Sequence, residues 1–310
     1  MRDLHELPKL RDSLSYLYVE QAVLNRKHNA VEYVNVEGAV MIPVASLGVL
    51  MLGPGTSITH AAIRVLAENG CSVLWVGEEG TRFYAQGMGE TRKAYRLLKQ
   101  GQLASDPARR SEVVLRMYRK RFGVELDLSL SLPQVRGLEG ARMRRAYAEA
   151  SQAHGVSWSG RRYDRSDWAG SDPVNRALSA ANALLNGLCH AAIVSGGYSP
   201  ALGFIHTGKQ LSFVYDIADL YKTEITIPVA FATAGASTEH VDSRTRAACR
   251  DRFREVKLLE RILPDVDSIL DLTHVEDGVS EEVDFDADGA QPAELWSPLM
   301  DAEEDAAWSS

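Results

Sequence analysis

The sequence predicts an α+β fold in which an N-terminal β-rich domain precedes a larger all-α domain. Short apolar runs rich in β-branched residues, separated by turn residues, fill about the first 90 positions. After a glycine-rich hinge at Gly87–Gly89, apolar residues recur instead with the period of helices. From about Asp271 the chain becomes acidic. We therefore expect a β-rich domain at 1–89, a helical domain at 90–270 and a disordered tail at 271–310.

The predicted strands are bounded by turn residues. They cover Leu14–Leu24, Val31–Val36, Ala39–Ile42, Gly48–Leu52, Ser72–Val76 and Arg82–Gln86. One helix interrupts them at Thr56–Asn69, started by Thr56 or Ser57 and stopped by Gly70. The GPGTS loop before it lacks the Gly-Lys-Ser/Thr ending of a phosphate-binding loop. We therefore expect it to cap the helix, and we expect no nucleotide cofactor.

The predicted helices of the second domain follow the 3.6-residue pattern. They cover Thr91–Leu103, Pro107–Phe122, Leu138–His154, Pro173–Ser195, Ser212–Lys222, Ile225–Ala234 and Val241–Leu263. Because Pro173–Ser195 carries almost no charge, it is predicted to be a core helix that packs on all sides.

Composition argues against membrane, secreted and zinc-binding classes. The most apolar run, Ala39–Leu52, is broken by a proline and a glycine, so we expect no membrane span and a cytoplasmic location. Cys71, Cys189 and Cys249 are far apart in apolar surroundings. They are predicted to be buried, reduced thiols.

The net charge of −8 conceals a strong asymmetry along the chain. The tail from Asp271 has 13 acidic residues and no Lys or Arg, which leaves a body with 34 basic and 29 acidic residues. Between Arg92 and Arg165 there are 17 basic and 7 acidic residues, and such a segment attracts phosphate backbones. A basic segment can also be a solvated face, but this one surrounds Glu139, which favours DNA binding.

The stretch Ala201–Lys222 places one imidazole and two carboxylates in otherwise apolar sequence. Helical spacing of its apolar residues puts Asp216 and Asp219 on one helical face. Two anions this close raise each other's pKa and disfavour folding unless a cation screens them, and a divalent metal would do so. The alternative is a solvated face whose aspartates pair with Lys209 or Lys222.

A third carboxylate stands in an unusual setting, which favours the functional interpretation. Glu139 lies near the start of the predicted helix Leu138–His154, flanked by small residues. The basic residues around it in the sequence are Arg136, Arg142, Arg144 and Arg145. An ordinary surface glutamate needs no such setting.

Four segments together resemble the CRISPR-associated integrase family Cas1, of the type I-E kind. They are RGLEGAR at 136–142, GFIHTGKQLSFVYDIADLYK at 203–222, SGRRYDRSDW at 159–168 and GTSITHAAIRVLAENGCSVLWVGEEG at 55–80. The likeness runs from about Leu14 to Leu263. It implies that the helical domain is a metal-dependent nuclease. It also implies that homodimers, two of them bridged by a dimer of the partner Cas2, insert foreign DNA spacers into a CRISPR array.

The resemblance also implies roles for single residues. The metal-binding positions of the family match Glu139, His206 and Asp219, and a further acidic position needed for activity matches Asp216. One imidazole with two or three carboxylates and no thiolate suits magnesium or manganese better than zinc. The sequence departs from type I-E relatives at Asn186, where they carry a tyrosine.

In the expected mechanism the ion polarises a phosphodiester while a DNA 3′-hydroxyl attacks it, and water in place of that hydroxyl would give hydrolysis. Asp216 is then an orienting residue outside the metal ligands, a ligand for a second ion, or a base near the hydroxyl. His206, beside Phe204 and Ile205, could also be an ordinary core residue, but its family match favours the ligand role.

The residues expected to contact DNA are basic or aromatic. They are Arg64, Arg82, Arg136, Arg142, Arg161, Arg162, Tyr163 and Lys209. Arginine can bridge phosphate oxygens with two bonds, whereas Tyr163 and Lys209 would reach unpaired bases nearest the site. Taken singly, each arginine is equally compatible with an ordinary surface charge.

Two other functions stay open. One is a general metal-dependent nuclease acting on branched or single-stranded DNA, and the other is a non-catalytic DNA-binding scaffold whose acidic cluster is an ion-pair network. The acidic tail adds a separate hypothesis, because its charge could compete with DNA for the basic segment. A partner surface could instead capture its apolar residues Trp296, Leu299 and Trp308, or the tail could have no role.

Overall fold

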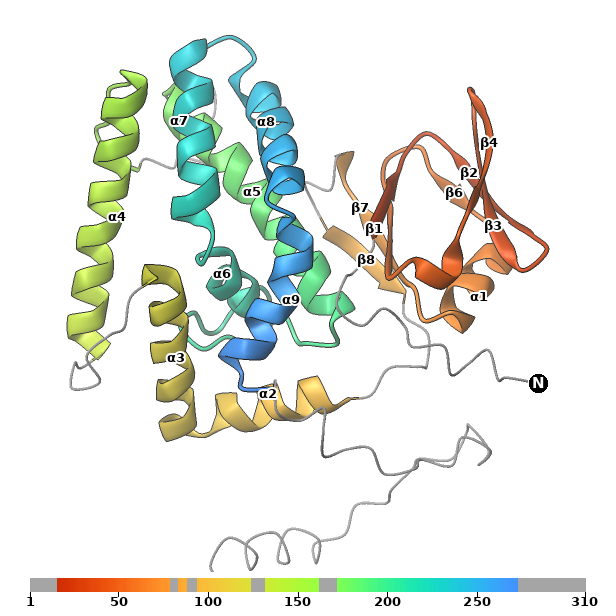
Figure 1. Ribbon diagram of the computed structural model, residues 1–310, viewed down its shortest axis with the longest axis horizontal. Helices are drawn as coiled ribbons and strands as arrows, with labels where there is room; N and C mark the ends of the chain where they lie inside the picture. The colour runs from red at the N-terminus through yellow and green to blue at the C-terminus, as the bar shows by residue number, and fades with distance from the viewer. Residues whose placement is uncertain (1–15, 79–82, 88–93, 124–131, 162–171, 273–310) are drawn as a thin grey trace, which may run out of the picture. The chain divides into compact units, whose positions relative to one another are not determined.

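The computed structural model describes residues 16–78, 83–87, 94–123, 132–161 and 172–272 (Figure 1). Strands occupy the N-terminal part of this range and helices make up the rest, which confirms the predicted α+β class. The domain boundaries at 89 and 270 stay predictions. The acidic tail beyond 272 and the candidate DNA contacts Arg82, Arg162 and Tyr163 lie outside the described residues.

Two four-stranded sheets form the N-terminal part (Figure 1). Their strands are β1 (Tyr16–Val19), β2 (Val23–Lys27), β3 (Ala30–Asn35), β4 (Gly38–Ile42), β5 (Val49–Leu52), β6 (Ser57–Ile58), β7 (Ser72–Val76) and β8 (Phe83–Gly87). One sheet has the order β1-β5-β7-β8, in which β8 alone runs antiparallel to its neighbour. The other has the order β4-β3-β2-β6, with antiparallel pairs except for β2 and β6.

One apolar core joins both sheets to helix α1 (His60–Glu68). Leu24 and Val31 enter it from one sheet, Leu50 and Val73 from the other, and Leu66 from α1, each at most 3% exposed. Burial of each such side chain stabilises the fold by about 1.5–3 kcal/mol. A short 3-10 turn, η2 (Val44–Ser46), leads into β5.

The helical part is built around α5. Its elements are α2 (Tyr95–Ser105), α3 (Pro107–Phe122), α4 (Leu132–His154), α5 (Pro173–Ser195), α6 (Ser212–Ala218), the π-helical turn η4 (Lys222–Thr226), α7 (Ile227–Ala236), α8 (Val241–Glu255) and α9 (Leu258–Ile269). Helices α6, α7, α8 and α9 all pack against α5, and α4 packs against α7 (Figure 1).

Helix α5 is the core helix that the sequence predicts. In the described part of the chain it is the one helix long and apolar enough to cross a membrane, but 61% of its apolar window is buried inside the protein. Its many alanines let four helices approach it closely. Cys189 on this helix is a buried thiol, as are Cys71 and Cys249, which confirms the prediction for all three.

Two elements near the N-terminus differ from their predicted bounds. The strand expected at Leu14–Leu24 is broken, because Gln21 takes a left-handed conformation with φ of 48° and the chain passes from one sheet to the other. The helix expected from Thr56 begins only at His60, because the preceding residues form β6 and pair with β2. Its cap is the hydroxyl of Thr59 and not Thr56 or Ser57.

Three helical predictions also change at their ends. Helix α4 begins six residues earlier than expected, since Pro133 is compatible with a first helical turn. The segment predicted as one helix at Val241–Leu263 is two helices, because Lys257 has a φ of 49° between them. The helix expected at Ile225–Ala234 is α7 at Ile227–Ala236. Pro228 cannot donate the backbone hydrogen bond of a regular helix, so the chain passes through the wide turn η4 before α7.

Candidate active site

Asp216 organises the loop that precedes α6. Its side chain is fully buried. Oδ2 accepts hydrogen bonds from the backbone N–H groups of Phe204, at 2.6 Å, and Ile205, at 3.1 Å. Oδ1 accepts one from the N–H of His206 at 2.9 Å. Three backbone donors on one carboxylate compensate its burial, because charge-assisted hydrogen bonds are the strong ones.

The same carboxylate orients the imidazole of His206. Nδ1 of His206 lies 2.7 Å from Oδ1 of Asp216, which assigns the N–H to Nδ1 and leaves the lone pair of Nε2 for another ligand. The hydrogen bond to Asp216 is the main cause that raises the pKa of His206, and partial burial opposes it. The ring is 44% exposed, so a ligand can reach it.

Neighbouring helices fix the shape of this loop. Arg110 of α3 donates hydrogen bonds to the carbonyl oxygens of Gly203 and Phe204 at 2.8–3.0 Å. Gln100 of α2 donates hydrogen bonds to the carbonyl oxygens of Ser199 and Leu202 and accepts one from the N–H of Ser199. A side chain at Gly203 is excluded, since its Cβ would lie 2.3 Å from the carbonyl oxygen of His206. The position of His206 therefore depends on the whole helical part.

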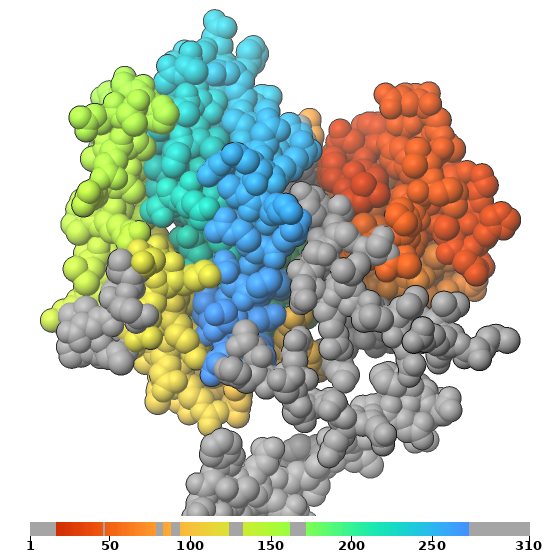
Figure 2. Space-filling view, in the orientation of Figure 1, coloured from red at the N-terminus to blue at the C-terminus, as the bar shows by residue number. Residues whose placement is uncertain are grey.

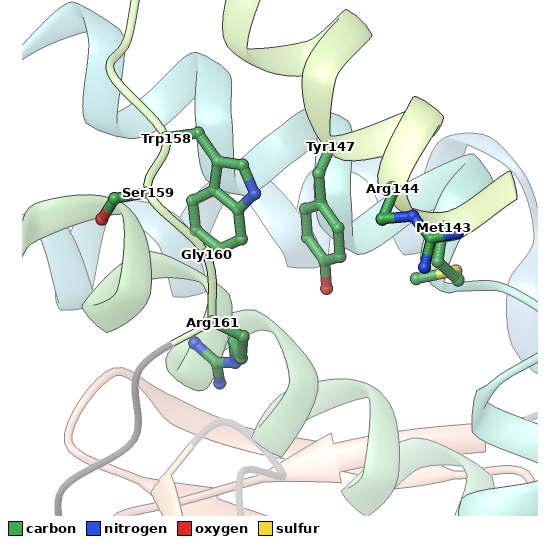
Figure 3. A pocket seen from close by; sticks show the side chains of 7 residues that line it. All are labelled: Met143, Arg144, Tyr147, Trp158, Ser159, Gly160 and Arg161. Atoms are coloured by element: carbon green, nitrogen blue, oxygen red, sulfur yellow. The ribbon is translucent and has the colours of Figure 1, made fainter. Parts of the chain in front are cut away.

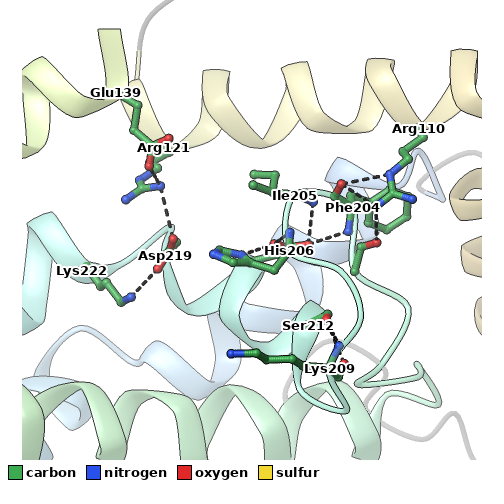
Figure 4. A network of polar contacts seen from close by, with 12 residues as sticks. Arg110, Arg121, Glu139, Phe204, Ile205, His206, Lys209, Ser212, Asp219 and Lys222 are labelled. Carbon is green, nitrogen blue, oxygen red and sulfur yellow. Dashed lines mark hydrogen bonds and ion pairs between the residues drawn. The ribbon is translucent and has the colours of Figure 1, made fainter. Parts of the chain in front are cut away.

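Asp219 and Glu139 both bind the guanidinium of Arg121 (Figure 4). Nη1 of Arg121, at the end of α3, lies 3.4 Å from Oδ2 of Asp219 and also binds Oε1 of Glu139 on α4. Lys222 approaches Oδ1 of Asp219 at 2.5 Å. The side chains of Glu139, Asp219 and Arg121 are 21%, 14% and 7% exposed, so this cluster is largely shielded from water.

The expected repulsion between Asp216 and Asp219 is relieved by the protein itself. Asp216 points into the loop, whereas Asp219, at the end of α6, pairs with Lys222 and Arg121. The ion pair with Lys222 is one that the sequence left open as an alternative to a metal. Repulsion between the two aspartates therefore does not require a metal.

The donor set fits a hard divalent ion. Nε2 of His206 and the carboxylates of Glu139 and Asp219 offer nitrogen and oxygen ligands, and the charge of Asp219 also acts on the His206 ring. Oδ1 of Asp219 is buried and accepts no hydrogen bond of good geometry, although Lys222 is close to it. Within the described residues no three His, Cys, Asp or Glu side chains are already arranged around one point as a metal requires.

Arg121, the cation that binds Glu139, was not among the candidate residues identified from the sequence. Among the arginines expected around Glu139, Arg142 instead donates to the carbonyl of Phe122 at 2.5 Å, and Arg145 pairs with Glu149. Arg121 arrives from α3, where it falls on the same buried face as Met117. An arginine on the apolar stripe of an amphipathic helix was the signal that could have identified it.

The candidate DNA contacts that the structure describes are spread over several elements. Arg64 on α1 pairs with Glu68 at 3.4 Å and remains 56% exposed. Arg161 donates to the carbonyl of Asn175 at 2.8 Å at the start of α5. Arg136, Arg142 and Lys209 are also exposed, on α4 and in the loop before α6. In Figure 2 the surface of α4 stands beside that of α3. Arg142 joins the two helices through its bond to the carbonyl of Phe122.

A pocket of about 490 Å³ opens between α4 and the segment that follows it (Figure 3). It is lined by Met143, Arg144, Tyr147, Trp158, Ser159, Gly160 and Arg161. The rings of Tyr147 and Trp158 stack with centroids 4.8 Å apart. Burial is the main cause that raises the pKa of Tyr147, and the charge of Arg161 opposes it. Met143, which lines the pocket, also contacts Arg121, so the pocket lies beside the carboxylate cluster. Its aromatic and guanidinium lining suits nucleotides.

Comparison with known proteins identifies the family of the chain. Residues 15–125 and 120–249 match the family model for "CRISPR associated protein Cas1". The chain belongs to the Cas1 family. The predicted Cas1 family is thus confirmed, while its type I-E subdivision stays a prediction.

Two curated Cas1 proteins and one solved Cas1 structure illustrate the similarity. The chain is 56% identical over 298 residues to CRISPR-associated endonuclease Cas1 2 of Thermus thermophilus, covering 95% of this chain and 90% of that protein. It is 41% identical over 268 residues to CRISPR-associated endonuclease Cas1 of Escherichia coli, covering 86% and 88%. A crystal structure of a TtCas1–DNA complex superposes with a TM-score of 0.78 at 57% identity, covering 85% of this chain and 99% of that one.

Proposed function

We propose that this protein is a metal-dependent DNA integrase and endonuclease of CRISPR adaptation, which inserts foreign DNA spacers into a CRISPR array. The observation that carries the proposal is that Glu139 and Asp219, from separate parts of the chain, bind the same guanidinium, while the charge of Asp219 also acts on the ring of His206. The Cas1 relatives are called endonucleases, and one of them was crystallised with DNA.

In this proposal the chain's own residues hold and orient the reacting groups. Glu139, His206 and Asp219 bind a magnesium or manganese ion through carboxylate oxygens and Nε2. When bound, the ion supplies Lewis-acid polarisation of a phosphodiester attacked by a DNA 3′-hydroxyl, or by water during cleavage. Asp216 keeps the proton of His206 on Nδ1, so that Nε2 presents a lone pair.

DNA would approach across the basic surface of α4. Arg144 and Arg161 line the pocket beside the carboxylate cluster, and the stacked rings of Tyr147 and Trp158 offer a face for an unpaired base. Arg136, Arg142 and Lys209 lie exposed on α4 and in the loop before α6. We propose that the remaining candidate contacts, Arg64, Arg82, Arg162 and Tyr163, extend this surface, and that Cas1 homodimers act with a Cas2 dimer in the cytoplasm.

Strand joining in a purified system tests the proposal. The protein is mixed with Cas2, a short duplex with free 3′-hydroxyl ends and a supercoiled plasmid that carries a CRISPR repeat. We expect joined products that need Cas2 and Mg²⁺ or Mn²⁺. Glu139→Ala, His206→Ala and Asp219→Ala should each abolish them, because each removes a ligand, while the duplex affinity measured by gel shift survives.

The same assay separates the other two functions. Degradation of branched or single-stranded DNA without Cas2, and no joining, would favour a general nuclease. Joining that survives all three substitutions would make the cluster an ion-pair network and the protein a scaffold. Asp251→Ala is a matched control, since its carboxylate is 79% exposed and pairs with Arg254 on the outside of α8.

A further inference from the structure

Arg121 is bound by two of the proposed metal ligands at once. Its guanidinium donates through one nitrogen to both Glu139 and Asp219, and its other terminal nitrogen lies 3.4 Å from Sδ of Met143. The side chain is 7% exposed and therefore occupies the interior of the site. In Figure 4 it lies between Glu139 and Asp219.

The two carboxylates need such a cation. Partly buried anions in a shielded cluster are costly unless a positive charge compensates them. Asp219 has a second cation, Lys222, on its other oxygen. Arg121 is thus the group that draws Glu139 of α4 and the end of α6 together, 80 positions apart in the sequence.

A divalent ion requires the same oxygens. It binds carboxylates at about 2.0–2.6 Å, so a guanidinium between them blocks their convergence on one point. In this structure the two carboxylates are therefore held on Arg121 and not on a shared metal position.

We propose that Arg121 is an internal cation that competes with the divalent metal for Glu139 and Asp219. In the metal-free protein the guanidinium holds the two carboxylates together, and metal binding requires it to release them. The proposal rests on the proposed metal function and adds a positioning residue to it. Its consequence is that Arg121 stabilises the metal-free fold and weakens metal affinity.

Mn²⁺ affinity, measured from the electron paramagnetic resonance signal of unbound Mn²⁺, tests this directly. We expect Arg121→Met to bind Mn²⁺ about tenfold more tightly than the wild type, within the usual range of such couplings. The same variant should melt at a lower temperature in EDTA and gain more from added Mn²⁺. Lys120→Met is the matched control, because Lys120 is the adjacent cation on α3 but pairs with Asp265 at 2.6 Å. It should leave Mn²⁺ affinity unchanged.

Two further variants keep the result decisive. Arg121→Lys retains the charge but not the fork that bridges two carboxylates, so it should bind Mn²⁺ with intermediate affinity. It replaces Arg121→Met if that variant does not fold. Unchanged or weaker Mn²⁺ binding by the Arg121 variants would overturn the competition. If Glu139→Ala still fails to bind Mn²⁺ in the same experiment, the proposed metal site stands. Equal binding by wild type and Glu139→Ala would overturn both proposals.

Discussion

A single carboxylate determines where the imidazole of the site points. Asp216 accepts three backbone hydrogen bonds and one from the His206 ring, and it lies on the buried face of α6. Of the three roles that the sequence left open for Asp216, this geometry favours the orienting one. We expect its substitution to act through His206 and the loop, and not through a lost metal ligand.

Replacement of Asp216 by asparagine tests this role at the residue scale. The amide would turn an N–H₂ group towards backbone N–H donors, leaving them without acceptors, so we expect Asp216→Asn to lower the free energy of unfolding by about 2–3 kcal/mol. Urea denaturation measures this change. The exposed Asp251→Asn should cost almost nothing, and an equal loss in both variants would contradict the role.

Chemistry-bearing residues could be predicted from the sequence only where a motif marked them. Glu139, His206, Asp216 and Asp219 were selected in that way, and the structure brings Glu139 and Asp219 onto Arg121. Arg121 carries no motif. Its role follows from the packing of α3 against α4, which periodicity within one helix does not specify. The hydrogen bonds that Asp216 accepts from backbone N–H groups likewise cannot be predicted from the residue types alone.

At the scale of elements, the loop before α6 behaves as part of the site. Its backbone is fixed by Arg110, by Asp216 and by the absence of a side chain at Gly203. This loop connects α5, the centre of the helical part, to α6, which ends at Asp219. Any distortion of the loop therefore moves His206 relative to the carboxylates.

Two glycine substitutions of opposite sign test this dependence. Gly203→Ala places Cβ 2.3 Å from the His206 carbonyl oxygen, so we expect a lower melting temperature and weaker Mn²⁺ binding. Gly101→Ala in α2 has nothing within 4 Å and should stabilise the protein by about 0.5–1 kcal/mol through helix propensity. Scanning calorimetry and Mn²⁺ titration check both, and tight Mn²⁺ binding by Gly203→Ala would contradict the dependence.

Elements with strong local signals were predicted closely. Asp106 and Asp172 cap helices that begin at Pro107 and Pro173, and both helices have the predicted bounds. The break at Lys257 was missed, because no glycine or proline marks its left-handed conformation. Both α8 and α9 pack against α5, and such contacts between distant segments cannot be inferred from local sequence patterns.

The contact between β8 and α5 predicts a pH dependence. The ring of His190 lies 3.9 Å from that of Phe83, and burial lowers the pKa of His190 to about 4. In the unfolded chain the imidazole of His190 binds a proton with its ordinary pKa near 6.5, whereas in the folded protein it stays neutral to a lower pH. The stability contributed by neutral His190 is therefore complete above about pH 6.5 and is lost as the pH falls towards 4.

Substitution of the imidazole isolates this effect. Between pH 7 and pH 5 we expect the melting temperature of the wild type to fall by roughly 2–4 °C more than that of His190→Leu, the equivalent of about 1 kcal/mol. Parallel pH profiles of the two proteins would show that His190 does not carry the dependence.

For the molecule as a whole, charge is divided between a basic body and an acidic tail. The tail beyond Leu272 lies outside the described residues, so its competition with DNA stays a hypothesis from the sequence. We expect deletion of residues 272–310 to tighten non-specific DNA binding at low salt, with the gain disappearing as salt rises. Gel shifts at several ionic strengths measure it. An unchanged low-salt affinity would reject the hypothesis.

We propose that Glu139, His206 and Asp219 hold one divalent ion in the Cas1 fold. A crystal structure after a Mn²⁺ soak, with anomalous diffraction, tests it most directly. We expect a single strong anomalous peak bonded to both carboxylates and to Nε2 of His206, with the guanidinium of Arg121 displaced from them. A Mn²⁺ peak elsewhere in the helical part, with these three side chains still unconverged, would contradict it.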